Sequence, residues 1–187
     1  MRRKDREIAD RQGLLTILQS CAVCRLGLAA DNKPYVTPLN FGYTWGEDEP
    51  LRLYFHSARE GLKLDMLAQN DLVCFEMDCE HKLIRGENPC DYSFAYASII
   101  GWGRACVITR EEEKRQALHK LMEHQAGPGT YAFSAADLDK VTVFCLTAEE
   151  ISGKRSPSPA LRATSPYGGG LVLSQLSYKK GGEDGLV

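Results

Sequence analysis

The sequence predicts a mainly β protein with flanking helices, in which six antiparallel strands form a closed or split barrel. Short runs alternate apolar and polar side chains with the period of two that half-buried strands show. Most of these runs are separated by turns, and one crossover helix interrupts the series, which is typical of a barrel. The expected strands comprise residues 22–30, 34–45, 51–56, 72–77, 94–108 and 141–146.

Length and charge restrict the classes of protein that fit. The chain has 187 residues, of which 43% are hydrophobic, and this is enough for one well-buried domain. A net charge of −2 gives no electrostatic signature of nucleic-acid or acidic-membrane binding. No apolar run approaches the roughly 20 residues of a membrane span. We therefore expect neither a nucleic acid nor a membrane as a partner.

The two ends of the chain differ in composition from its middle. Residues 1–13 are charged throughout and lack the apolar core of a secretory signal. Seven cysteines, an odd number, are typical of reduced thiols, so we expect a cytoplasmic protein. We expect one domain over residues 1–155. Residues 156–187, rich in Ser, Pro, Gly and Lys, are expected to form a weakly ordered tail in which 171–176 could add an edge strand.

The first three elements are predicted to be a helix followed by a hairpin. Asp10 can cap a helix with an apolar stripe, and the turn at 31–34 joins the first two strands. The second strand has one face of small or short side chains: Val36, Pro38, Asn40, Gly42 and Thr44. A flat or bulky group could lie close to that face. Pro38 cannot donate to a ladder, which indicates an edge, a bulge or an opening of the sheet. An ordinary barrel strand with a corner is the alternative.

The stretch 51–63, LRLYFHSAREGLK, reads as a strand that runs directly into a helix. Ser57 and Glu60 have the spacing of a capping box, which predicts a helix start at Ser57. A helix N-terminus favours an anion, and Ser57, Arg59 and Lys63 could add a hydroxyl and two cations. One interpretation is a phosphate site with His56 beside it. The other is a capped amphipathic helix with solvated charges.

The second half of the chain is predicted to contain a loop, a long strand and two helices. Residues 78–92 are polar and long for a connection, which indicates a functional or mobile loop. Residues 94–108 form a strand with one mostly small face. Thr109 and Glu112 are spaced as a capping box for the next helix, whose core side includes Leu118, Leu121 and Met122. A short helix is expected at 134–138.

Common nucleotide-binding and hydrolase motifs are absent from the sequence. Cys21 and Cys24 form a C-x-x-C, for which buried thiols at a helix–strand junction are the main interpretation and a redox or zinc role the alternative. A minor hypothesis makes metal ligands of Cys74, Cys79, His81 and Cys90. Our main interpretation assigns no metal ligand. The spacing of His119 and His124 places them on different helix faces, and we expect both to be solvent-exposed.

Four segments in order carry a resemblance to a known family. They are PYVTPLNFGY, LYFHSAREGLK, VCFEMD and YASIIGWGRA. This order resembles the pyridoxamine 5′-phosphate oxidase-like flavoproteins, which have the FMN-binding split-barrel fold, and within them the nitroimidazole-resistance proteins. The resemblance covers about residues 8–155.

The resemblance implies a homodimer of six-stranded barrels that binds FMN at the subunit interface. It implies that the phosphate lies against Ser57 and Lys63, and that the isoalloxazine lies along Val36, Thr37, Pro38 and Asn40. Ser98 and Trp102 are further candidates for the same pocket. In the nitroimidazole-resistance proteins the histidine of this segment lies close to the flavin, which makes His56 the candidate catalytic residue.

Two sets of segments typical of true pyridoxamine phosphate oxidases are missing: R-x-x-x-L-K with S-R-K, and the C-terminal Arg-containing motif. We therefore expect no vitamin B6 chemistry. The leading hypothesis is an FMN-dependent oxidoreductase that takes electrons from a nicotinamide donor and reduces nitroaromatic or related small acceptors. Thr37 and Asn40 could hydrogen-bond the flavin edge, and His56 could donate a proton, because a histidine side chain in general changes its charge near neutral pH. The alternative is a flavin- or haem-binding module without a dedicated reaction, with His56 or His81 as an axial ligand.

Overall fold

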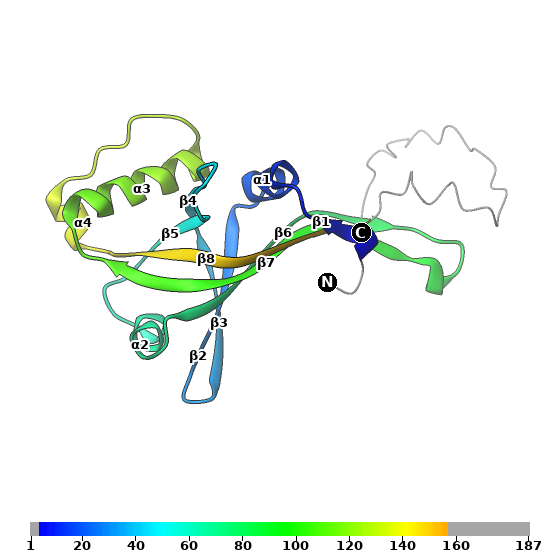
Figure 1. Cartoon of the computed structure of the whole chain (residues 1–187), viewed down its shortest axis with the longest axis horizontal. Coiled ribbons are helices and arrows are strands. Elements are labelled where there is room, and N and C mark those ends of the chain that lie inside the picture. The colour runs from blue at the N-terminus through cyan, green and yellow to red at the C-terminus, as the bar shows by residue number, and fades with distance from the viewer. Residues whose placement is uncertain (1–3, 157–187) are drawn as a thin grey trace, which may run out of the picture.

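The computed structural model describes residues 4–156, in which one antiparallel sheet of eight strands is flanked by four α-helices (Figure 1). The elements in chain order are η1 (Lys4–Arg6), β1 (Glu7–Ile8), α1 (Arg11–Ser20), β2 (Val23–Ala30), β3 (Lys33–Asn40), β4 (Gly42–Thr44), β5 (Arg52–Ser57), α2 (Leu62–Gln69), β6 (Leu72–Ile84), η2 (Pro89–Asp91), β7 (Ser93–Ile108), α3 (Glu111–Ala126), α4 (Ala135–Asp139) and β8 (Thr142–Arg155). The expected tail, apart from Ser156, lies outside the described residues.

The sheet curves into a split barrel, as expected, and its two outer strands are not joined by a ladder. The strand order is β3-β2-β6-β7-β8-β5-β4, and β1 pairs with β8. Strands β3 and β4 are consecutive pieces of one segment interrupted at Phe41, yet β3 bonds to β2 whereas β4 bonds to β5. Both ends of the strand order therefore meet at Phe41. Beyond this point β3 and β5 lie near each other without forming a ladder, and this opening is the split.

The expected number of six strands is corrected by two features. The first is the interruption at Phe41, which divides the expected strand 34–45 into β3 and β4. The second is the short strand β1, which pairs Glu7 with Lys154 and Ile8 with Gly153. A two-residue strand has too little alternation to be recognised from sequence.

Aromatic and aliphatic side chains fill the barrel. Phe41, Phe55, Phe75 and Phe144 are fully buried, and the rings of Phe55 and Phe144 stack with their centroids 5.2 Å apart. Phe55 and Phe75 occupy the inward positions of strands that alternate more and less buried side chains, so the period-2 pattern of the sequence places these two rings in the core.

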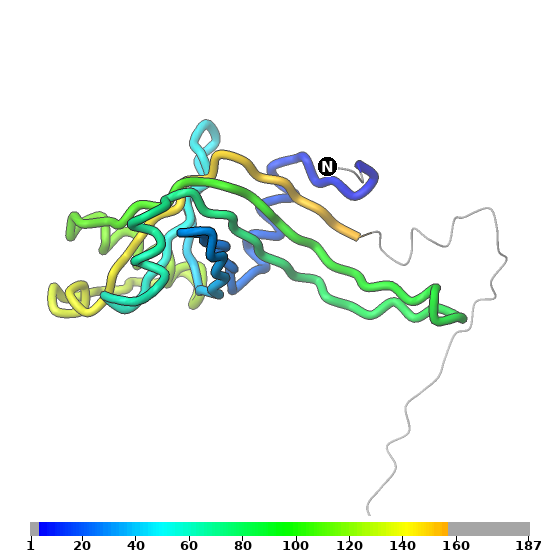
Figure 2. The backbone as a smooth tube through the Cα atoms, turned by 90° about the horizontal axis from the view of Figure 1, so that it is seen from below, coloured from blue at the N-terminus to red at the C-terminus, as the bar shows by residue number. Residues whose placement is uncertain are grey.

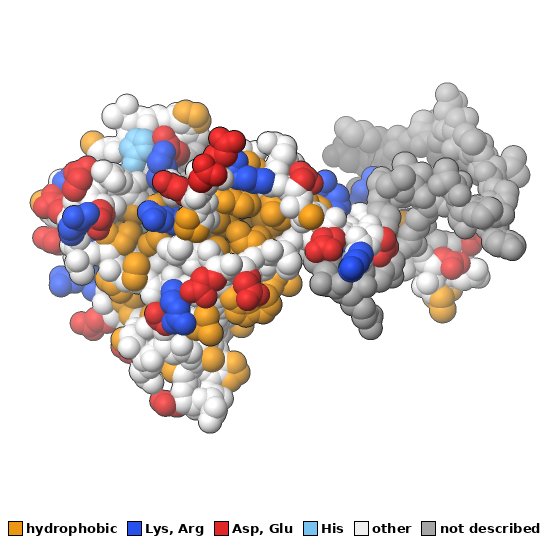
Figure 3. Space-filling model, in the orientation of Figure 1, with side chains coloured by type: hydrophobic (Ala, Val, Ile, Leu, Met, Phe, Trp, Pro, Cys, Tyr) orange, Lys and Arg blue, Asp and Glu red, His pale blue; other side chains and the backbone are white. Residues whose placement is uncertain are grey.

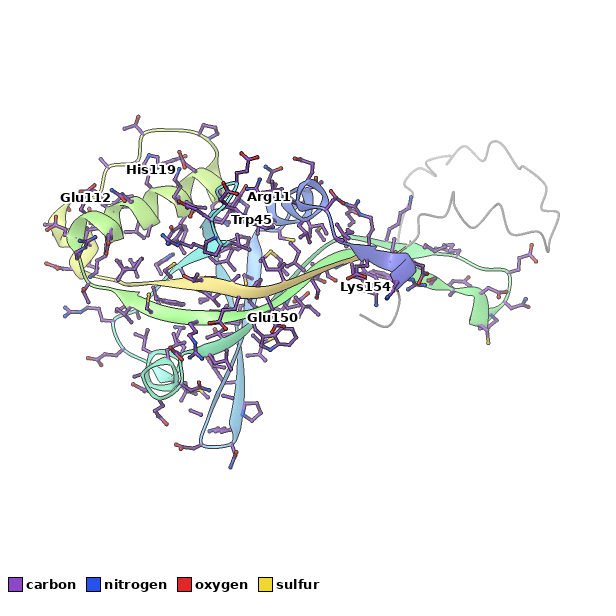
Figure 4. The ribbon with its side chains drawn as sticks, in the orientation of Figure 1. Arg11, Trp45, Glu112, His119, Glu150 and Lys154 are labelled. Carbon is purple, nitrogen blue, oxygen red and sulfur yellow. The ribbon has the colours of Figure 1, made fainter. Side chains whose placement is uncertain are left out.

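Helix α1 covers part of the barrel with Leu14, Ile17 and Leu18. Asp10 caps it as expected, because its Oδ1 accepts a hydrogen bond of 2.7 Å from the N–H of Gly13. Arg11 holds the loop after β4: its guanidinium lies 5.1 Å from the ring centre of Trp45 and donates to the carbonyls of Trp45 and Gly46 (Figure 4).

Helices α2 and α3 begin differently from the sequence-based expectation. Helix α2 begins at Leu62 after Gly61, and α3 begins at Glu111 after Arg110; neither N-cap residue makes a side-chain capping bond. The capping box expected at Ser57 is wrong because β5 continues through Ser57, which pairs with Thr142 of β8. The short helix α4 does have a capping box, formed by Ser134 and Asp137.

The expected loop at 78–92 is mostly a hairpin arm. Strands β6 and β7 continue past the barrel and remain paired up to Ile84 and Ser93, with a register shift between Cys79 and Lys82. Figure 2 shows this arm extending away from the barrel, with β8 alongside its first part. Polar residues on both faces of the arm hide the alternation on which a strand prediction depends. Among the described residues, no helix is long and apolar enough to cross a lipid bilayer.

Candidate functional site

The split between β3 and β5 leaves backbone edges without a strand partner. Only the other edge of β3 is bonded, to β2, and β4 covers β5 only from Arg52 to Tyr54. The outward side chains bordering this opening are Val36, Pro38 and Asn40 of β3 and His56 of β5, all exposed. Val36 is 65% exposed, which is unusual for a branched apolar side chain. The split therefore presents two exposed apolar side chains, Val36 and Pro38, next to backbone groups without a strand partner.

Asn40 and Thr37 occupy different environments on β3. The side-chain amide of Asn40 donates to the carbonyl of Ala22 at 3.1 Å and to Oε1 of Gln125 in α3 at 3.2 Å. Asn40 thus ties β3 to the start of β2 and to the end of α3. Thr37 is only 7% exposed and its side chain faces the core, so only its backbone can meet a ligand in the split.

The loop after β5 gives an open helix N-terminus. Gly61, with φ 137°, precedes α2, and a Cβ built on it meets no atom within 4 Å. The first N–H groups of α2 have no intrahelical acceptor and their dipole favours an anion. Lys63, half-buried in the first turn, adds a positive charge. Ser57 is buried and its hydroxyl donates to the carbonyl of Ala58 at 2.9 Å, so this hydroxyl is directed to the backbone.

His56 borders a cavity of about 450 Å³ between β5, α3 and α4. The walls of this cavity are mainly apolar, and its charged lining residues are Asp137 of α4 and Lys140, which follows α4. Its apolar lining residues are Leu118, Leu121, Met122, Phe133 and Val141. The volume lies within the range of ordinary small-molecule sites. Sequence analysis assigned Leu118, Leu121 and Met122 to a core-facing stripe but gave no signal that this stripe lies next to His56.

Ser98 and Trp102 lie on a different part of the barrel from the split. Both project outward from β7, and Trp102 is 43% exposed. In the strand order, β8 separates β7 from β5, while β6 and β2 separate it from β3. At about 4.8 Å per strand, these separations keep both side chains out of the split of their own chain. Figure 3 shows hydrophobic side chains interspersed with acidic and basic ones on the face that carries β7 and β8.

The expectation that both histidines of α3 are solvent-exposed is wrong for His124. Its Nε2 lies 2.8 Å from the carbonyl oxygen of Cys21, and its ring centre lies 4.6 Å from Phe41 and 5.2 Å from Tyr43. Burial lowers the pKa of His124, and the hydrogen bond to Cys21 only partly opposes this. His119 keeps a more open position and lies 3.5 Å from a carboxylate oxygen of Glu123.

The cysteines give no sign of a metal centre. Cys21 and Cys24 are both buried, in agreement with the main interpretation of the C-x-x-C, and burial raises the pKa of Cys24 to about 12. His81 of the arm pairs with Asp78, its Nε2 lying 2.6 Å from Oδ2. Within residues 4–156, no group of three or more His, Cys, Asp or Glu side chains is arranged to hold a metal ion.

Comparisons with known proteins agree with this architecture. A Bacteroides thetaiotaomicron protein assigned provisionally to 5-nitroimidazole antibiotic resistance is 32% identical, with 80% of this chain and 86% of that chain covered and a TM-score of 0.68. An FAD- and haem-binding protein of Mycobacterium smegmatis is 18% identical, with 92% and 91% covered and a TM-score of 0.71. A flavocytochrome of Azotobacter vinelandii is 19% identical, with 98% and 86% covered and a TM-score of 0.68. At these two lower identities the likeness concerns the fold alone.

No curated protein sequence matches the chain. The sequence model of the pyridoxamine 5′-phosphate oxidase family, in contrast, matches residues 10–155, a span that begins at the N-cap of α1 and ends at the last residue of β8. The split barrel, the 32% identical relative and this match together lead to one conclusion: the chain belongs to the pyridoxamine 5′-phosphate oxidase-like family.

Proposed function

We propose that the protein is an FMN-dependent oxidoreductase that reduces nitroaromatic or related small acceptors with electrons from a nicotinamide donor. The proposal rests on three features of the split strands and their continuation: the exposed outer face of β3, the mainly apolar cavity that His56 of β5 borders, and the open N-terminus of α2 with Lys63, which follows β5 after the short connection 58–61. The 32% identity to a protein linked with nitroimidazole resistance supports the acceptor class.

The residues at the split fit the parts of FMN. The N–H groups at the start of α2 and the Lys63 ammonium suit a phosphate, because both offer positive charge to an anion. Val36 and Pro38 offer apolar contact to a planar ring, and the unpaired edges of β3 and β5 offer donors and acceptors to its polar rim. When bound, FMN supplies the electron transfer, and the protein supplies binding, orientation and protons.

His56 is proposed to hold and deliver a proton to the acceptor. Its side chain borders the cavity of about 450 Å³, whose apolar walls suit an aromatic acceptor and limit the access of water. An imidazole can change its charge near neutral pH, so it can donate to a group that becomes more basic on reduction. Asn40 is proposed to position β3 through its bonds to Ala22 and Gln125 in addition to any contact with the ring.

A second copy of the chain is proposed to complete the site. Ser98 and Trp102 are remote from the split of their own chain, so they can contact the flavin only if they belong to the partner in a homodimer. Trp102 and Ile100 form an exposed apolar area on β7, and exposed apolar areas rimmed by polar residues are typical of protein interfaces. A cytoplasmic location is part of the same proposal, because nicotinamide donors are available there.

A flavin- or haem-binding role without a dedicated reaction is the second candidate. The fold likeness to the Mycobacterium smegmatis FAD- and haem-binding protein and to the Azotobacter vinelandii flavocytochrome supports it. The exposed imidazole of His56 is the residue in the split that could act as an axial haem ligand. A larger flavin such as FAD is also compatible with the open space before α2.

Absorption titrations of the purified chain with FMN, FAD and haemin test these alternatives. We expect flavin bands at one FMN per chain, and Lys63→Ala should weaken FMN binding at least about tenfold because it removes a charged phosphate partner. Lys33→Ala, at the exposed first residue of β3, is the matched control and should leave binding unchanged. A Soret band with haemin and no response to FMN would support the haem candidate and contradict ours.

Turnover of His56→Asn separates binding from catalysis. We expect FMN affinity within about threefold of the wild type and nitroaromatic reduction at least about 100-fold slower, the usual effect of removing a general acid. Undiminished turnover in this variant would show that His56 does not supply the proton.

A further inference from the structure

Two cysteines face each other across the ladder between β7 and β8. Cys106 and Cys145 are directly opposed in the antiparallel register. Opposed residues in such a ladder project to the same face, with Cα atoms about 4.5 or 5.5 Å apart depending on the type of pair. Both values lie within the range of about 4.4–6.8 Å that a disulfide spans. The register therefore brings two thiols to a separation that a disulfide can bridge.

Both thiols border a cavity of about 420 Å³ beneath α3. Cys106 is exposed, whereas Cys145 is only 7% exposed at the base of the cavity. A reagent in solution therefore meets Cys106 first. The lining also carries three charged side chains: Arg52 of β5, and Glu113 and Lys120 of α3.

The charges around the cavity favour an anionic reagent. Arg52 lies in it on β5 and makes no ion pair with any residue between 4 and 156, so its guanidinium is available to a carboxylate. Of the other charged lining residues, Lys120 is held by Glu123, with Nζ 2.7 Å from Oε2, and Glu113 pairs with Arg110. Burial raises the pKa of Cys145 to about 11, and Arg52 acts against this rise by favouring the thiolate. Cys145 thus remains a protonated thiol at neutral pH.

The other cysteines are placed differently. Cys24 is fully buried, Cys74 of β6 lies opposite Gly27 and Trp102, and Cys90 lies exposed in η2 with no cysteine opposite it in a ladder of the described residues. Cys21 and Cys79 are close enough for their thiols to hydrogen-bond, but Cys21 is 3% exposed and Cys79 precedes the register shift of β6. Cys21 and Cys79 are therefore the second pair of thiols that could form a disulfide in this chain.

We propose that Cys106 and Cys145 form a redox-active dithiol that small anionic disulfides, such as glutathione disulfide, oxidise to an intramolecular disulfide. The Cys106 thiolate attacks one sulfur of the disulfide, which forms a mixed disulfide and releases one thiolate that takes a proton. The thiol of Cys145 then loses its proton to solvent and attacks the Cys106 sulfur, and the second small thiol leaves. The protein dithiol is oxidised by two electrons, and one small disulfide is reduced to two thiols.

The disulfide is expected to be reversible. Opposed Cβ atoms in a ladder are about 4.5–5.5 Å apart, whereas a disulfide holds them at about 3.8 Å. Formation of the disulfide therefore requires β7 and β8 to move closer to each other beneath α3. Disulfides that need such movement, or that are exposed, are typically the labile ones. Reduced glutathione should therefore restore the dithiol.

The proposal is tested on the full chain by equilibration in glutathione buffers, alkylation of the remaining thiols and peptide mass mapping. We expect the Cys106–Cys145 linkage to form first. Cys145→Ser should accumulate glutathione on Cys106, because the resolving thiol is missing, and Cys106→Ser should form neither species. Cys90→Ser is the matched control and should leave the wild-type pattern unchanged.

Arg52→Gln tests the charge preference. We expect it to slow oxidation by glutathione disulfide at least about threefold while leaving the rate with uncharged hydroxyethyl disulfide unchanged, because only the anionic reagent gains from a cation. Formation of the Cys21–Cys79 linkage before Cys106–Cys145, or a wild-type protein that retains a stable mixed disulfide on Cys106, would overturn the proposal.

Discussion

His124 is the histidine whose surroundings most restrict its charge. Its ring lies between Phe41 and Tyr43, and its Nε2 lies at hydrogen-bond distance from the carbonyl of Cys21, to which a neutral imidazole protonated at Nε2 can donate. Burial disfavours the charged form, so the pKa of His124 lies below its ordinary value of 6.5. The bond links the C-terminal turn of α3 to the residue that ends α1.

The lowered pKa makes stability depend on pH. Below about pH 6.5, His124 binds a proton in the unfolded chain but stays neutral in the folded protein, because its folded pKa is lower. The free energy of unfolding therefore decreases as the pH falls from about 6.5 to the folded pKa of His124, and it levels off below that pKa. Urea unfolding between pH 8 and 5 measures this. His124→Phe should flatten the profile, whereas His119→Gln on the same helix should retain the decrease. Equal slopes for wild type and His124→Phe would refute the assignment.

The position of His124 could have been recognised from the sequence. Ala117, Leu121 and His124 are spaced at i, i+4 and i+7, which is one face of a helix, and the first two are buried. The spacing of five residues between His119 and His124 shows only that the two histidines lie on different faces of the helix, not that His124 shares the buried face. Asp10 was predicted correctly because a cap needs only local geometry. The cavity beside His56 could not be predicted, because it depends on how α3 and α4 dock on β5.

Gly42 fixes the contact between α3 and the barrel. A Cβ at this position would lie 2.3 Å from the backbone nitrogen of Leu121 and 2.4 Å from its Cα. These are backbone atoms, which cannot move aside as a side chain does. Helix α3 therefore packs against β4 at Gly42, where only glycine leaves room for the helix backbone. Gly42 directly follows the interruption at Phe41.

Gly42→Ala should destabilise the protein by about 1–3 kcal/mol or more, the usual cost of overpacking. Gly27→Ala is the matched control: it also lies in a strand, its Cβ would meet its nearest neighbour at an ordinary 3.5 Å, and its stability should change by less than about 1 kcal/mol. Denaturant unfolding of both variants gives the comparison. Equal stabilities would show that α3 shifts to accommodate the added methyl group.

Element boundaries were predicted well where local signals decide and poorly where pairing decides. The turn at 31–34 and the hairpin of β2 and β3 agree with the sequence. The pattern S-x-x-E occurs at Ser57, but the ladder with Thr142 keeps Ser57 in β5, and α2 starts five residues later. The arm was expected to be a loop because its sequence shows no alternation of apolar and polar residues. In the structure, the pairing between β6 and β7 holds it extended.

The turns between alternating strands and the one crossover helix predicted a closed or split barrel, and the sheet has the split form. The candidate site was predicted on β3 and on the stretch 51–63, and its residues stay a prediction. The sequence could not show that Ser98 and Trp102 lie two or more strands away from β3, because strand order depends on long-range pairing. This separation is the reason that the proposed site requires a second chain.

The outward face of β6 and β7 is the proposed dimer contact. Trp102 and Ile100 of β7 and Leu72 of β6 are each 40% or more exposed. Ion pairs border them: Arg25 lies 2.6 Å from Asp78, and Arg104 lies 2.6 Å from Asp71, measured between the closest nitrogen and oxygen atoms. An apolar centre with a charged rim is the usual arrangement of a specific interface, and tryptophan is enriched among the residues that dominate binding.

Trp102→Glu should convert the proposed dimer to monomers, because it places a charge in the centre of the contact. It should also weaken FMN binding at least about tenfold, because it removes the ring that the partner would offer to the flavin. Val107→Glu is the control: Val107 is 50% exposed on the same strand but lies five residues away, toward the end that precedes α3. Light scattering after gel filtration gives the mass, and fluorescence titration gives the affinity. If Trp102→Glu remained dimeric yet lost FMN, the tryptophan would belong to the site without holding the dimer. If it became monomeric and still bound FMN as tightly, the flavin would need only one chain, and the requirement for a partner at the split would be wrong.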